Sequence, residues 1–117
     1  MTLRLPGKPS SDLWRKSPAG ALDYEIAQET ASALGRHGRA LEAALKELAD
    51  FDAADRPADQ IDRAARAALV ATAAQAFWQF IVQREACGLR DAGMVVRMYR
   101  VPVEVQHRMG AFPLRRP

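Results

Sequence analysis

Apolar residues recur with helical spacing along most of the chain, and they define two long segments. The first runs from about Leu22 to Phe51, where apolar residues repeat every seven positions at Ala27, Leu34, Leu41 and Leu48. Such a repeat places one apolar stripe along a helix, as in the seam between two packed helices. The second runs from 61 to 87 and contains nine alanines, the best helix former, without proline or glycine. We therefore predict two long helices.

Residues near the ends of the second segment mark where its helix starts and stops. Asp62 places negative charge at the start, and Gly88 stands where a C-terminal glycine cap belongs. The preceding residues, 52–58, contain a proline and two aspartates, and this connection is short enough to join antiparallel neighbours. Asp62 also lies four residues before Arg66, a spacing that predicts an ion pair on the helix surface.

Two glycines interrupt the first long helix. Gly35 and Gly38 each cost about 1 kcal/mol relative to alanine inside a helix, so their presence calls for a reason. If the two long helices fold back on each other, these glycines face the region of Phe77 and Trp78. Close packing against a bulky aromatic side chain is the favoured explanation, and a helix kink is the alternative.

Two short helices are predicted after the second long one. Asp91 can cap the first, which extends to about Tyr99. Pro102 suits the first turn of the second, which Gly110 closes. No stretch of useful length alternates apolar and polar residues as a strand would.

The sequence thus predicts an all-α fold, a long antiparallel helical hairpin (20–51 and 59–87) followed by two short C-terminal helices. Near the end of the second long helix, apolar side chains occur almost all round it. One hairpin partner cannot cover them, so the C-terminal segment, a second copy of the chain, or both must pack there. Two copies would complete a four-helix bundle, and a homodimer is expected. The residues predicted for self-association are Phe77, Trp78, Phe80 and Ile81.

The length of the chain and the positions of its prolines predict how it is organised. Its 117 residues suit one domain. Residues 1–18 hold three prolines and are predicted to form a flexible tail, 19–110 a single helical domain and 111–117 a C-terminal tail. No uninterrupted apolar run approaches the ~20 residues of a membrane span, and none follows the N-terminus as in a signal peptide. We expect a cytoplasmic protein with no membrane partner.

The net charge of +3 is concentrated at the two ends of the chain. Residues 1–16 carry four basic side chains against one acid, as do residues 100–117, whereas the region between them is acidic overall. Basic tails of this modest charge are usually solvated tails, so nucleic acid is not an expected partner on charge alone.

Residues that carry chemistry are few and scattered. His37, His107 and Cys87 fall in different predicted elements, and no zinc-binding or Glu-x-x-His pattern occurs. Glycine-rich phosphate loops are also absent from the sequence. We therefore predict no catalytic residue, no metal and no cofactor, and expect a protein that is not an enzyme.

One segment suggests a different function. Residues 95–109 have the outline of a helix-turn-helix, with a turn at Arg100 and Val101 and with Val101 and Val105 as the buried positions. As a DNA reader it would rely on Arg100 and Arg108, while its second helix also presents Glu104. A structural helical corner is the favoured interpretation, and a small DNA-binding regulator is the alternative function.

Three segments of the sequence resemble a known family. They are LDYEIAQETASALGRHGRALEAAL, FIVQREACGLRD and YRVPVEVQHRMG. Together they are similar to a small all-helical bacterial family of unknown function, best represented in alphaproteobacteria, over about residues 21–110. The resemblance implies a soluble bacterial protein and assigns no activity or catalytic residue.

These observations favour a non-enzymatic helical protein, an oligomerising interaction or scaffold module. The expected partners are a second copy in a homodimer and a protein that the sequence does not identify.

Overall fold

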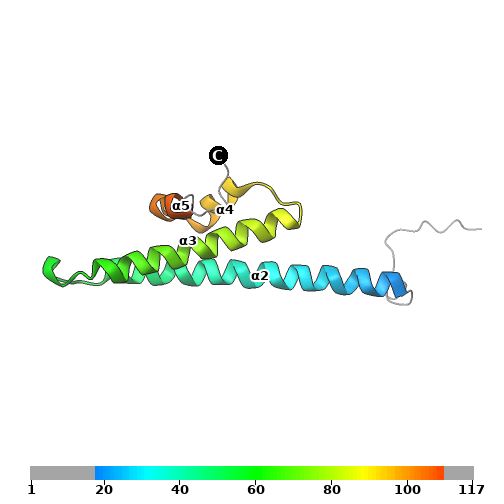
Figure 1. Ribbon diagram of the computed structural model, residues 1–117, viewed down its shortest axis with the longest axis horizontal. Coiled ribbons are helices and arrows are strands. Elements are labelled where there is room, and N and C mark those ends of the chain that lie inside the picture. Colours follow the sequence, from blue (N-terminus) through cyan, green and yellow to red (C-terminus); the bar gives the residue numbers. More distant parts are fainter. Residues whose placement is uncertain (1–17, 110–117) are drawn as a thin grey trace, which may run out of the picture. The chain divides into compact units, whose positions relative to one another are not determined.

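The computed structural model describes residues 18–109, and its regular elements there are helical. Four α-helices and one 3₁₀ turn follow in chain order, α2 (Pro18–Ala53), η1 (Ala58–Gln60), α3 (Arg63–Ala86), α4 (Ala92–Tyr99) and α5 (Val103–Met109). The prediction of an all-α fold, with two long helices followed by two short ones, is confirmed (Figure 1).

The chain divides into two compact units, 1–33 and 34–117. Of the first unit, the structure describes residues 18–33, and of the second, residues 34–109. The single domain predicted over 19–110 stays a prediction. The predicted tails and the Gly110 stop signal lie outside the described residues, except that Pro18 already belongs to α2.

In the first unit, the described residues form the start of α2. Gly20 is buried, but the large apolar side chains of Leu22 and Ile26 are 57% and 55% exposed. Ala27 and Ala31, which belong to the predicted apolar stripe, are also exposed. The residues of the predicted apolar stripe are therefore buried only farther along α2.

In the second unit, the residues of α2 from 34 onward lie beside α3 (Figure 1). Leu41 and Leu48, from the predicted heptad stripe, are 0% and 3% exposed. The two helices run antiparallel, because Asp52 pairs with Arg66 at one end. The predicted hairpin is thus confirmed in this unit.

The two short helices complete the core of the second unit. α5 packs against α3, and the corner between α4 and α5 inserts three valines that are at most 5% exposed. Dense apolar burial of this kind is the main source of stability for a small domain. The core consists of Leu41, Ala44, Leu48, Val70, Ala73, Ala74, Ala76, Phe77, Phe80, Val95, Val101 and Val105.

Helix ends follow the signals in the sequence. The carboxylates of Asp62 and Asp91 accept hydrogen bonds from backbone amides three residues later, which caps α3 and α4. Gly88 has a positive φ of 85°. The amide of Leu89 donates to the carbonyl of Arg84, and that of Gly88 to Glu85, which together form a Schellman motif. These three predicted signals are confirmed.

The side chain of Arg56, which the sequence pattern did not point to, closes the loop after α2. The guanidinium of Arg56 donates to the carbonyl of Phe51 at 3.0 Å. Its central carbon lies 4.0 Å from the centre of the Phe51 ring, a cation–π contact. Arg56 thereby satisfies a carbonyl in the last turn of α2.

Gly38 allows aromatic side chains to approach the backbone of α2. A Cβ at this position would lie 3.0 Å from the Tyr99 hydroxyl and 3.4 Å from Cζ of Phe80. The two rings contact each other edge to face, with centroids 5.5 Å apart. Aromatic packing is therefore the reason for this glycine, although the partners are Phe80 and Tyr99 instead of Phe77 and Trp78. At Gly35, a Cβ would meet only the flexible Arg39 side chain.

By length and composition, α3 alone among the described helices could cross a membrane. Those two properties are shared by the central helix of a folded domain. In this chain α3 supplies six apolar residues to the core.

Alanine substitutions at the two glycines should separate helix propensity from aromatic packing. We expect Gly35→Ala to raise the free energy of unfolding by about 1 kcal/mol, because only a flexible arginine tip must move. Gly38→Ala should gain clearly less or lose stability, because the new methyl group crowds Tyr99 and Phe80. Denaturant unfolding followed by circular dichroism measures both, and equal gains would contradict the packing role of Gly38.

Candidate functional site

A groove of about 950 Å³ lies between the last turns of α2 and the corner that joins α4 to α5. All of its lining residues belong to the second unit. They are Glu42, Leu45, Lys46, Leu48, Ala49, Asp52 and Ala53 of α2, and Met98, Tyr99, Arg100, Pro102 and Glu104 from the corner.

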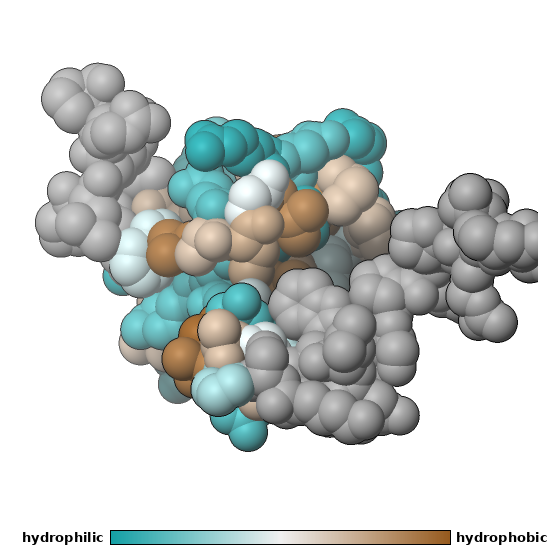
Figure 2. Space-filling model, turned by 90° about the vertical axis from the view of Figure 1, so that its right-hand side faces the viewer, coloured by the Kyte–Doolittle hydropathy of each residue, from teal (hydrophilic) through white to brown (hydrophobic). Residues whose placement is uncertain are grey.

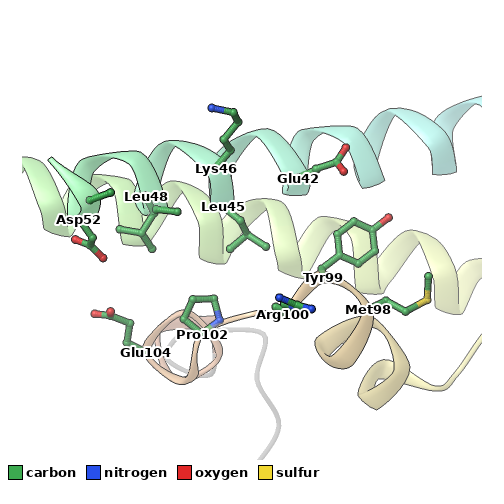
Figure 3. Close-up of a pocket in the computed structure, with 12 residues that line it drawn as sticks. Glu42, Leu45, Lys46, Leu48, Asp52, Met98, Tyr99, Arg100, Pro102 and Glu104 are labelled. Carbon is green, nitrogen blue, oxygen red and sulfur yellow. The ribbon is translucent and has the colours of Figure 1, made fainter.

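The floor of the groove is apolar and its rim is charged. In Figure 3, Leu45 and Leu48 point from α2 toward the corner, where Pro102 faces them, whereas Lys46 points away. Met98 is 68% exposed, so the apolar lining continues to the surface of the molecule. An open apolar channel with a polar rim is the arrangement by which proteins receive an apolar helix face or ligand.

Arg66 joins two residues that line this groove, Asp52 and Glu104, through two bidentate ion pairs. Its Nε and Nη2 donate to the carboxylate oxygens of Asp52 at 2.8 and 2.9 Å. Its Nη1 and Nη2 donate to those of Glu104 at 2.9 and 2.7 Å. Because the three residues lie on α2, α3 and α5, a single guanidinium joins three helices.

These contacts fix the charge of all three groups. Hydrogen bonds from Arg66 lower the pKa of both Asp52 and Glu104 and outweigh the opposing effect of burial. The same bonds, first with Glu104 and then with Asp52, raise the pKa of Arg66. Both carboxylates therefore stay ionised at neutral pH. The prediction of an Asp62–Arg66 pair is wrong, because Asp62 caps α3 and Arg66 reaches across to two other helices.

Arg100 occupies an unusual position at the corner. Its backbone is left-handed, with φ 54° and ψ 51°, a region that favours glycine. The amide of Val101 donates to the carbonyl of Val96 at 3.1 Å, so Arg100 holds the place of a C-terminal glycine cap. Within the described part of the chain its guanidinium forms no hydrogen bond or ion pair. The groove is therefore lined by a strained arginine with an available charge.

The two arginines proposed for DNA contact lie in different hollows. Arg100 lines the groove, whereas Arg108 lines a smaller hollow of about 360 Å³ together with Arg63 and Arg66. The second helix of the corner, α5, is only seven residues long, and its Glu104 is held by Arg66. The corner exists as predicted, but its two arginines do not line the same hollow.

The residues predicted for self-association differ in their exposure. Phe77 and Phe80 are 2% and 5% exposed and belong to the core of their own chain. Trp78 and Ile81 are half-buried. The predicted surface therefore narrows to these two side chains, because the chain's own α2 and α4 already cover the phenylalanines.

The chemistry-bearing residues are not brought together. Among residues 18–109, no cluster of histidine, cysteine, aspartate or glutamate could hold a metal ion. The thiol of Cys87 is free and lies at the end of α3.

Sequence reasoning did not find the groove or the role of Arg66. Asp52 and Glu104 lie 14 and 38 residues from Arg66, so no local spacing connects them. The available signals were an arginine in the first turn of a helix and exposed apolar residues at the corner, and neither is specific.

The fold and groove define a class of protein: an all-α hairpin capped by a helical corner, with an apolar groove between them. The sequence belongs to a family of unknown function, DUF6665, which it matches over residues 12–116. The resemblance to a family of unknown function is thereby confirmed. No curated protein and no solved structure matched the chain.

Removing the charge of Arg66 should change how stability depends on pH. The ion pairs of Arg66 lower the folded-state pKa of Asp52 and Glu104. The stabilisation by these ion pairs is therefore complete above the ordinary carboxylate pKa of ~4, and it is lost as the pH falls through the lowered pKa values. We expect the unfolding temperature of the natural chain to fall steeply on acidification, and that of Arg66→Gln to fall less. Thermal unfolding between neutral and strongly acidic pH measures this difference.

Arg66→Lys provides the control for that experiment. Lysine keeps the positive charge but lacks the planar fork that binds two carboxylates at once, so its curve should lie between the other two. If the unfolding temperatures of all three proteins fall in parallel with pH, the ion pairs of Arg66 do not contribute to stability.

Arg100→Gly should stabilise the chain. Glycine adopts the left-handed conformation without steric cost, so we expect the free energy of unfolding to rise by about 1 kcal/mol. Arg97→Gly, at an exposed position inside α4, should lower it by about the same amount. Denaturant titration of both variants checks the signs, and a loss of stability in Arg100→Gly would refute this account of the corner.

Proposed function

We propose that this chain is a non-enzymatic, self-associating helical interaction module whose contact site is the groove between α2 and the α4–α5 corner. The observation that carries the proposal is the open apolar floor of that groove. Leu45, Leu48 and Pro102 line it, Met98 extends it to the surface, and residues 18–109 leave the groove open.

The shape and chemistry of the groove support a helix as its occupant. A helix-in-groove contact needs an apolar channel that receives side chains one turn apart, with polar groups along the edges. The floor contributed by α2 and the charged residues Glu42, Lys46 and Arg100 match this description. Exposed apolar surface of this kind usually marks a contact site.

The electrostatics of the groove favour binding over catalysis. A general acid or base works best when its pKa lies near the working pH. Asp52 and Glu104 have lowered pKa values and engage Arg66 through both oxygens. They act as fixed structural charges, which supports a non-enzymatic role.

The groove replaces the aromatic end of α3 as the main candidate for self-association. In the groove, Leu45 is half-buried and Ala49 and Pro102 are exposed, whereas Phe77 and Phe80 are buried inside their own chain. Trp78 and Ile81 remain a second surface on which two copies would meet if the groove were not involved. A dimer that completes a four-helix bundle would use that second surface.

A charge placed in the groove should dissociate the assembly. Ala49 is exposed and lines the groove, so Ala49→Glu puts a carboxylate into the apolar floor without disturbing the core. Ala43 is exposed on the same helix but does not line the groove, so Ala43→Glu is the matched control. We expect light scattering on a dilution series to give twice the mass of one chain for the natural protein and the control. Ala49→Glu should give a single chain, or dissociate at ~10-fold or more higher concentration.

Two results would contradict the proposal. A natural chain that is monomeric at every concentration does not self-associate. An assembly that withstands Ala49→Glu forms elsewhere, and Trp78→Glu would then test the second surface.

A further inference from the structure

A second hollow, of about 360 Å³, lies between α3 and α5 in the second unit. Ligand sites in proteins usually measure about 300–1,000 Å³, so a hollow of this size suits a small molecule. Its lining consists of Arg63, Arg66, Ala67 and Val70 of α3 and of Glu104 and Arg108 of α5. Three of these six residues are arginines.

The spacing of the lining residues along α3 explains the hollow. Arg63, Ala67 and Val70 follow one another by four and three residues, so they lie along one face of the helix. Val70 is buried, whereas Ala67 is exposed and carries only a methyl group. The short side chain of Ala67 leaves space between the two helices. The hollow therefore has a small apolar floor beside long cationic side chains.

Two of the three arginines have unused hydrogen-bond donors. Among residues 18–109, the guanidiniums of Arg63 and Arg108 form no hydrogen bond or ion pair. Glu104 lies four residues before Arg108, a spacing at which the two would ordinarily pair. The carboxylate of Glu104 instead accepts through both oxygens from Arg66. Arg66 thereby leaves the charge of Arg108 available.

Positive charge exceeds negative charge around the hollow. Arg63, Arg66 and Arg108 contribute three positive charges. Two carboxylates oppose them, Glu104 in the lining and Asp52 on the far side of Arg66, and Arg66 binds both. One positive charge is therefore in excess.

The carboxylate of Asp62, beside Arg63 in the sequence, has a different partner. It accepts a hydrogen bond from the amide of Ala65 at 2.9 Å and so caps the first turn of α3. Its negative charge there faces the positive end of the helix dipole. Asp62 thus leaves the donors of Arg63 unused.

Exposed charges alone would not make a binding site. Hydrophilic residues, coloured teal, cover a large part of the face shown in Figure 2. Arg63 and Arg108 differ from solvated surface charges because they border one hollow from two helices. Guanidinium groups bind carboxylates and phosphates. A single guanidinium already satisfies the two oxygens of a carboxylate, whereas two of them from separate helices match the larger number of oxygens on a phosphate group.

We infer that this hollow binds the phosphate group of a small molecule. Arg63 and Arg108 donate to the phosphate oxygens, and Ala67 and Val70 contact the apolar part of the same molecule. Arg66 is a positioning residue, because it keeps Glu104 away from Arg108. The inference is independent of the proposed function, since Glu104 is the one residue that lines both this hollow and the groove beside α2.

Titration with inorganic phosphate provides the first test, made on the full-length chain. Sodium chloride keeps the ionic strength constant, so that general screening does not change. We expect saturable changes in the NMR signals of the backbone amides of Arg63, Ala67 and Arg108. Acetate, the matched carboxylate probe, should bind about tenfold or more weakly than phosphate, because it can engage one guanidinium at a time.

Removal of single charges tests the two arginines. Arg63→Gln and Arg108→Gln should each weaken phosphate binding about tenfold or more, the loss expected for hydrogen bonds to a charged group. Arg90→Gln is the matched control, because Arg90 is exposed and lines neither this hollow nor the groove. It removes the same charge and should leave the dissociation constant unchanged.

Filling the hollow tests its shape without altering any charge. Ala67→Leu should abolish saturable phosphate binding, because the larger side chain occupies the space beside the two arginines. Ala64→Leu is the matched control, since Ala64 is exposed on the same helix and does not line the hollow. Circular dichroism establishes that both variants keep the helical fold.

Four results would overturn the inference. They are a natural chain without a saturable response to phosphate, an equal loss in Arg90→Gln, normal binding in Ala67→Leu, and acetate that binds as tightly as phosphate. If duplex DNA binds through Arg63 and Arg108 while inorganic phosphate does not, the arginines contact a nucleic-acid backbone and the small-molecule site is refuted. Because none of these measurements depends on self-association, they leave the proposed function to its own test.

Discussion

The guanidinium of Arg66 holds together the ends of three helices. It reaches the last turn of α2 and the first turn of α5 from the first turn of α3. The side chain is 30% exposed, so water weakens each ion pair, yet the planar fork fixes both carboxylates in one orientation. The position of α5 therefore depends on this contact together with the burial of Val105, and the position of α5 determines whether a groove exists beside α2.

Local signals in the sequence were sufficient for the helices and their ends. Asp62, Gly88 and Asp91 act through backbone groups within a few residues, so type and spacing alone reveal them. Arg66 has no such local partner. Its two acids are set by how the helices pack, and the nearby Asp62 offered a misleading alternative. The groove could not be predicted either, because it lies between segments that become neighbours only in the folded chain.

The aromatic end of α3 shows how one small residue changes the interpretation of a pattern. Apolar residues all round a helix indicate that more than one surface must cover them. In this chain Gly38 lets Phe80 approach the backbone of α2, and Tyr99 covers the same ring from the corner. The chain itself thus buries both phenylalanines, and its C-terminal corner is one of the two surfaces that the sequence offered to cover them. Large apolar side chains that remain exposed are spread over the described residues, from Leu22 and Ile26 in α2 to Met98 at the groove.

The corner between α4 and α5 combines stability and strain. Val101 and Val105 are buried, which fixes the path of the chain on both sides of Arg100. That path requires a left-handed residue, and glycine would meet the requirement at no steric cost. An arginine there costs stability but places a long cationic side chain beside an apolar floor. Backbone strain of this kind often occurs at functional sites, and here it places the charge of Arg100 at the edge of the groove.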